Sequence, residues 1–102
     1  MWRKDTMSEL SIKMIEKEFI PFLRFETKEV LAEESEKIQR TILLHTAMLL
    51  GNCFKEKVTI TFKSEEGINE VKTTVWAATD DSIVLKGGAV IPVKSILDVK
   101  IF

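Results

Sequence analysis

The second half of the chain, residues 57–102, contains short runs of β-branched and aromatic residues separated by glycine-rich and acidic turns. In order along the chain these runs are VTITF, VKTTVWA, SIVLK, AVIPV and ILDVKIF. Strands this close in sequence pair with their neighbours in antiparallel fashion, because a parallel crossover needs about a dozen residues or more. The pattern therefore predicts a five-stranded antiparallel meander that closes into a small barrel.

Alternation assigns the faces of these strands. In the first run, apolar residues alternate with Thr59, Thr61 and Lys63, as in a strand with one face in water. The second run alternates up to Val75 and is apolar on both faces beyond it, which is typical of a strand that bends across a small barrel. The aliphatic and aromatic positions placed on one side form the predicted core: Val58, Ile60, Phe62, Val75, Leu85, Ile96 and Val99.

Glycine and proline mark the last turns. Gly87-Gly88 is a two-residue hairpin signal. Pro92 suits the end of a short or edge strand and not the middle of a central one. We therefore expect residues 92–95 to form a tight corner or a single helical turn before the last strand, residues 96–102.

The first half of the chain has helical periodicity. Apolar residues recur at helical spacing over residues 8–20, and Pro21 cannot continue the helix, so the pattern predicts a first short helix there. A second, longer helix is predicted over residues 28–50, with Thr27 as its N-cap and Gly51-Asn52 as its end. The predicted fold class is α+β, with two N-terminal helices followed by the barrel.

Composition predicts one domain. The 102 residues are 45% hydrophobic and 30% charged, enough for one modest core. We expect residues 1–6 to be a disordered extension that adds little to stability, residues 7–52 to be helical and residues 53–102 to form the barrel. No run has the length of a membrane span, no signal-peptide pattern is present, and a lone cysteine fits a reducing compartment, so we expect a cytoplasmic protein.

The segment DDSIVLKGGAVIPVKSILDVKI, residues 80–101, resembles the region of Sm-like proteins where an Asp-led turn precedes an aliphatic strand and a short corner closes the barrel. The resemblance covers roughly residues 54–102 and implies an Sm-like or SH3-like barrel, with RNA as a candidate partner. Where Sm-like RNA binders carry an aromatic-Lys-His set or an Arg-Gly pair, this chain has Ile91-Pro92-Val93-Lys94. The whole chain also resembles small bacterial proteins, which implies a bacterial setting but does not point to an activity.

Candidate catalytic residues are few. His45 is the only histidine and Cys53 the only cysteine. A lone histidine on an apolar helix is more often a core or interface residue than a general base, and an enzyme that uses His45 with Cys53 would lack the third, orienting group of a triad. We expect Cys53 to be buried, and we expect no enzymatic activity, no cofactor and no metal.

Self-association is the leading expectation for function. The segment TILLHTAMLL, residues 41–50, is apolar around most of its circumference, and one small barrel covers only one side of a helix. We therefore expect a homodimer that belongs to a non-enzymatic interaction module with an unidentified protein partner. The candidate self-association residues are Ile42, Leu43, Leu44, Ala47 and Met48.

An Sm-like RNA-binding protein is the alternative. The net charge of −1 gives no basic footprint of the kind that nucleic-acid binders show. Trp76 is either an exposed aromatic platform or is covered by the helices, and Lys86 and Lys94 flank the glycine turn and the corner. The candidate partner or RNA-binding residues are Trp76, Lys72, Lys86 and Lys94.

Overall fold

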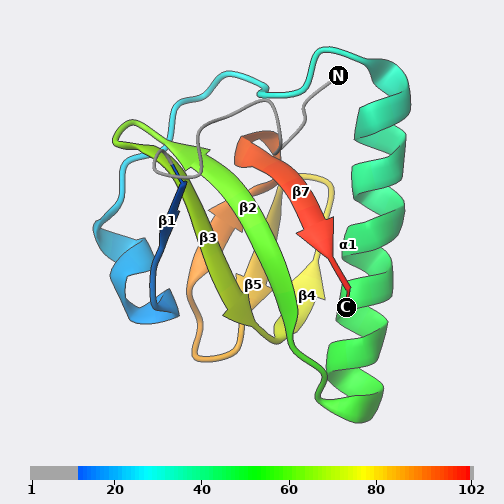
Figure 1. The fold of residues 1–102 in the computed structure, drawn as a ribbon. Coiled ribbons are helices and arrows are strands. Elements are labelled where there is room, and N and C mark those ends of the chain that lie inside the picture. The colour runs from blue at the N-terminus through cyan, green and yellow to red at the C-terminus, as the bar shows by residue number, and fades with distance from the viewer. Residues whose placement is uncertain (1–11, 102) are drawn as a thin grey trace.

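Seven strands and one α-helix form the described part of the chain, residues 12–101 of a computed structural model. The architecture is α+β, with the helix alongside two sheets (Figure 1). The extension predicted over residues 1–6 lies outside the described residues.

The strands fall into two sheets, one in the order β1-β3-β2-β7 and one in the order β4-β5-β6. The strands are β1 (Ile12–Met14), β2 (Val58–Ser64), β3 (Gly67–Thr73), β4 (Val75–Ala78), β5 (Ser82–Leu85), β6 (Val90–Pro92) and β7 (Ile96–Lys100). The helices are α1 (Glu34–Phe54) and two short 3-10 helices, η3 (Lys17–Phe22) and η4 (Val93–Ser95).

The prediction of a five-stranded meander closed into a barrel is wrong. The run VKTTVWA, predicted as one bent strand, is divided at Thr74 between β3 in the first sheet and β4 in the second. The carbonyl of Thr74 accepts a hydrogen bond of 2.9 Å from the amide of Lys86, and the register of β4 with β5 shifts between Val75 and Ala77. Among the described strands no ladder joins the two sheets, so the barrel is not closed.

The first predicted helix does not form over its described residues. β1 pairs in parallel with β3, with Ile12 opposite Ile68, and the amide of Ile15 donates to the carbonyl of Glu70 at 2.9 Å. η3 follows, with Pro21 inside it. Without β1, one side of β3 would present unpaired backbone groups, and pairing with that edge satisfies them. A short isolated helix is only marginally stable, so it does not compete with the pairing of β1 and β3.

The second predicted helix exists, but its bounds differ: it begins at Glu34 and ends at Phe54 instead of spanning residues 28–50. The segment before it is held in a non-helical conformation by long-range and local hydrogen bonds. The amide of Val30 donates to the carbonyl of Lys94 at 2.9 Å, and the amide of Leu31 donates to the Glu29 carboxylate at 3.0 Å. These bonds consume backbone donors that a longer helix would need.

Gly51 does not end the helix, because its role is close packing. A Cβ at this position would lie 2.4 Å from the carbonyl oxygen of Val75 and 2.9 Å from Cγ2 of Thr74. The missing side chain lets α1 approach β4 closely, and the helix continues to Phe54. Its C-cap is Lys55, in the left-handed conformation with φ of 56°.

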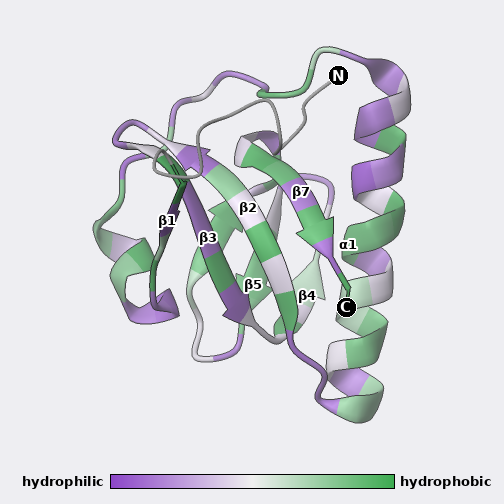
Figure 2. Ribbon diagram, in the orientation of Figure 1, coloured by the Kyte–Doolittle hydropathy of each residue, from purple (hydrophilic) through white to green (hydrophobic). Residues whose placement is uncertain are grey.

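The predicted core is confirmed. All of its members belong to one buried cluster that also takes in Ile20, Leu44 and Ala47 from the N-terminal half. Strand β2 alternates hydrophobic residues with less hydrophobic ones, and hydrophilic residues gather in the first turns of α1 (Figure 2). The corner is also confirmed, since η4 occupies residues 93–95. The glycine turn is confirmed by positive φ angles of 95° at Gly87 and 98° at Gly88.

Candidate functional site

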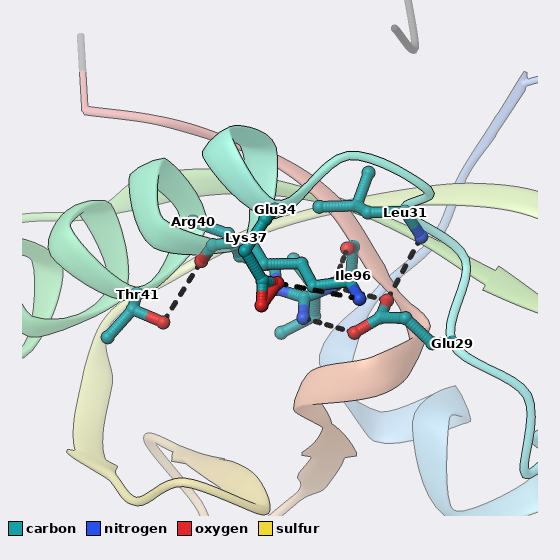
Figure 3. Close-up of polar contacts among 7 residues, drawn as sticks. All are labelled: Glu29, Leu31, Glu34, Lys37, Arg40, Thr41 and Ile96. Carbon is teal, nitrogen blue, oxygen red and sulfur yellow. Dashed lines mark hydrogen bonds and ion pairs between the residues drawn. The ribbon is translucent and has the colours of Figure 1, made fainter.

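The inner face of α1 is fixed to the sheets by both apolar and polar contacts. Its buried residues, Arg40, Leu44, Ala47 and Gly51, lie on one side of the helix, and α1 contacts β4 and β7. Figure 3 shows Arg40 reaching the carboxylate of Glu29 and the carbonyl of Ile96. The polar contacts anchor the first half of the helix, and Gly51 anchors its second half.

The outer face of α1 carries a row of three exposed apolar side chains with one histidine among them. We call it the exposed apolar stripe and define it as Ile38, Ile42, His45 and Leu49. These residues are spaced by four, three and four positions, so they share one side of the helix. Ile38, Ile42 and Leu49 are 58%, 55% and 59% exposed, and His45 is exposed between them. Such a row of large apolar side chains in water is the kind of surface that usually contacts a partner.

The predicted self-association residues do not share one surface. Leu44 and Ala47 are buried in the core, and Leu43 and Met48 are partly buried against it. Only Ile42 is exposed to solvent. The predicted set therefore mixes the inner face of α1, its flanks and its outer face.

His45 and Cys53 both lie on the surface of α1 and are not brought together. They are eight residues apart in one continuous helix, a separation of about 12 Å along its axis. Cys53 is exposed, and the expectation of a buried cysteine is wrong. We expected the helix to end between the two residues, at Gly51-Asn52. The helix α1 instead continues to Phe54, so both residues lie on one continuous helix.

The three predicted partner-binding lysines line two different hollows. Lys72 and Lys86 line the same hollow, together with Lys57. Lys94 lines another hollow that also contains Asp80 and Asp81, so its charge is opposed by nearby carboxylates.

Trp76 stands apart from these lysines. It is 49% exposed on β4, in the other sheet from Lys72. It lines neither of these two hollows. The indole is therefore partly available to a partner. It does not form a single platform with Lys72, because the two residues lie in different sheets.

Among the described residues no cluster of three or more His, Cys, Asp or Glu side chains has the arrangement of a metal site. Over the same residues no helix combines the length and the apolar character needed to cross a membrane. Comparisons with protein-family models, curated proteins and solved structures gave no match to this chain. The resemblance to Sm-like proteins gains no support from them, and functional inference rests on the residues themselves.

Proposed function

We propose that this protein is a non-enzymatic interaction module in which two copies associate through the outer face of α1. The observation that carries the proposal is the exposed apolar stripe, which lies opposite the buried face of the same helix. Alternating spacings of four and three residues are those that let two helices interlock side chains along a seam.

Charge at the two ends of α1 favours a second copy of this chain as the partner. Glu33 and Glu34 are exposed at the beginning of the helix, and Lys55 and Lys57 are exposed just after its end. An antiparallel pair with two-fold symmetry places the acidic end of each helix beside the basic end of the other. The helix dipoles also oppose each other favourably in this arrangement.

The size of the surface predicts a reversible dimer. The 21 residues of α1 span about 31 Å at 1.5 Å per residue. One helix pair of that length buries less area than the roughly 800 Å² per partner of a standard stable interface. We therefore expect association in the micromolar range, helped by the charges at the helix ends.

Sedimentation velocity over the micromolar range tests the interface. We expect the mass to rise with concentration, and we expect Ile42→Glu or Leu49→Glu to give a monomer, because each places a charge in the apolar seam. Gln39→Glu is the matched control: it adds the same charge at an exposed position of α1 outside the stripe and should leave association unchanged. A monomer at all concentrations in the unaltered protein, or equal loss of association in all three variants, would contradict the proposal.

A charge exchange tests the antiparallel orientation. Glu34→Lys alone places two positive groups together across the two-fold axis, and Lys55→Glu alone places two negative groups together, so each should weaken association. The double variant restores opposite charges at both ends and should recover it. A parallel helix pair would predict no recovery, because Glu34 and Lys55 would then lie at different ends of the seam.

An exposed thiol is compatible with a reducing setting. Cys53 is free and exposed, and such a thiol persists where cellular reductants keep it reduced. We propose a cytoplasmic location on this ground.

A further inference from the structure

Lysines from two strands, β3 and β7, and from the segment between α1 and β2 surround one hollow of about 480 Å³. Thr59 on β2 is paired on one side with Lys72 of β3 and on the other side with Lys100 of β7. The two lysines therefore lie in one row across the sheet, about 10 Å apart at the usual strand spacing. Lys55 and Lys57 complete the lining, with Glu56 as its only carboxylate.

A second hollow continues the first one, because Lys57 and Lys72 line both. It adds Lys17 from η3 and Lys86 from the turn after β5. The Lys17 side chain reaches the glycine turn, since its Nζ would lie 3.9 Å from a Cβ at Gly87. We call the combined surface the lysine track, defined by Lys17, Lys55, Lys57, Lys72, Lys86 and Lys100.

No lysine of the track forms an ion pair with another described residue. The ion pairs found among residues 12–101 are Lys37 with Glu34 and Arg40 with Glu29. The second hollow contains Glu16 and Glu18, yet lysines outnumber carboxylates in both hollows.

The fold separates charges that the net charge of −1 conceals. β3 ends, β2 begins and α1 ends at the same end of the molecule, whereas the turn after β2, with Glu65 and Glu66, lies at the other end (Figure 1). On the same face of the sheet the next row is Thr61 paired with Glu70 and Asp98, and in this row Thr61 and Glu70 are buried. Among the described residues of this sheet, the end that carries the lysine row is therefore the one better suited to an anion.

We propose that the lysine track binds the phosphate backbone of single-stranded nucleic acid. The track offers several separated point charges, which suits a chain of linked phosphates. Lysine lacks the planar fork that arginine uses to hold one phosphate through two hydrogen bonds, and no arginine lines either hollow within the described residues. The track shares Lys55 and Lys57 with the basic end of α1 but does not include the apolar stripe, so nucleic-acid binding is a second activity beyond the proposed self-association.

Fluorescence anisotropy with a labelled oligonucleotide of about twenty deoxythymidines tests the proposal. If four lysines each neutralise one phosphate, the logarithm of affinity should fall with the logarithm of salt with a slope of about −2.8. That slope corresponds to about a 50-fold loss of affinity between about 50 and 200 mM salt. The double variant Lys72→Gln/Lys100→Gln removes the two track lysines that flank Thr59 in the sheet and should reduce the slope to about −1.4.

Lys63→Gln is the matched control. Lys63 is exposed on β2 and on the same face as Thr59, but it lies four residues along the strand toward the acidic end. The Lys63→Gln variant should bind the oligonucleotide with the same affinity and salt dependence as the unaltered protein. Thermal unfolding of both variants checks that they fold, and sedimentation should show the same self-association, so that a failure of this site is separable from a failure of the α1 interface.

Three results would overturn the proposal. One is no anisotropy change at about 50 mM salt. Another is equal weakening by Lys63→Gln and by the double variant, which would indicate diffuse attraction over the whole surface. The third is displacement of the oligonucleotide by inorganic phosphate at an equal concentration of phosphate groups, which would indicate a site for a single anion and not for a chain.

Discussion

Arg40 donates two hydrogen bonds to the carboxylate of Glu29, from Nη1 to Oε2 at 2.8 Å and from Nη2 to Oε1 at 2.5 Å. Nη1 also donates to the carbonyl of Ile96 at 3.0 Å. The Arg40 side chain is 6% exposed and that of Glu29 is 25% exposed. One guanidinium therefore ties α1 both to the segment before it and to β7, and so sets the orientation in which α1 presents its apolar stripe.

Replacement of Glu29 by Ala should destabilise the protein by about 3 kcal/mol, because it leaves the buried charge of Arg40 without its partner. This is the low end of the range for a broken buried pair, since Glu29 retains some contact with water. The measurement is the free energy of unfolding in urea. The double variant Glu29→Leu/Arg40→Met removes both charges and should lose less stability than Glu29→Leu alone, whereas additive losses would show that the two residues act independently.

The same carboxylate should make stability depend on pH. Burial alone raises the pKa of Glu29, but hydrogen bonds from Arg40 and the Leu31 amide, with the charges of Arg40 and Lys37, outweigh it and hold the pKa below its ordinary value of 4.5. The folded state therefore binds fewer protons than the unfolded state at this site. The stabilisation is fully present above the unfolded pKa and is lost as pH falls through the lower, folded pKa.

Glu29→Gln provides the comparison, because it keeps the shape of the side chain and does not titrate. The difference in unfolding free energy between the unaltered protein and this variant should be largest near neutral pH and should shrink as pH falls below 4.5. A difference that stays constant over this window would mean that the carboxylate charge contributes nothing to the Arg40 contact.

Gly51→Ala should destabilise the protein although alanine favours helix formation by about 1 kcal/mol over glycine. The added Cβ would overlap the backbone of Val75 and the side chain of Thr74, and overpacking of this kind costs about 1–3 kcal/mol or more. Asn52→Ala, at the exposed neighbouring position, should be neutral or stabilising. If Gly51→Ala were the more stable variant in urea unfolding, α1 would not lie this close to β4.

Sequence alone predicted most of the β half because its signals are local. Alternation in β2, the glycine pair and Pro92 each fix a face, a turn or a corner within a few residues. The division between β3 and β4 was missed because an apolar run on both faces fits a bent strand as well as a strand that changes sheets. What decides between them is the bond between Thr74 and Lys86, twelve residues apart.

The N-terminal half was harder to predict because its structure depends on distant partners. β1 exists through its pairing with β3, more than fifty residues away in sequence, and Arg40 is buried only because Glu29 and Ile96 receive its hydrogen bonds. The apolar stripe was hidden for another reason. The segment 41–50 is apolar on nearly every side, so periodicity did not distinguish the inner face from the outer one.

The lysine track was only partly predictable. Lys72 and Lys86 were chosen as candidates, and they share a hollow. Lys17, Lys57 and Lys100 come from segments that only the sheet register and the packing of η3 bring beside them. The net charge of −1 gives no sign of the track, because acidic residues elsewhere in the chain balance the lysines in the total and not in space.

Leu85→Ala should cost about 2–5 kcal/mol, a large share of the stability of a small domain. Leu85 is fully buried, is paired with Val75 of β4, and belongs to the core cluster that both sheets share. Removing its side chain leaves a cavity between two sheets that no strand ladder joins among the described residues, so we expect the cavity to close only in part. Val90→Ala, at a position that is 47% exposed on β6, removes fewer buried atoms and should cost much less. Equal losses for the two variants in urea unfolding would show that the contact between the sheets at Leu85 adds little to the stability of the fold.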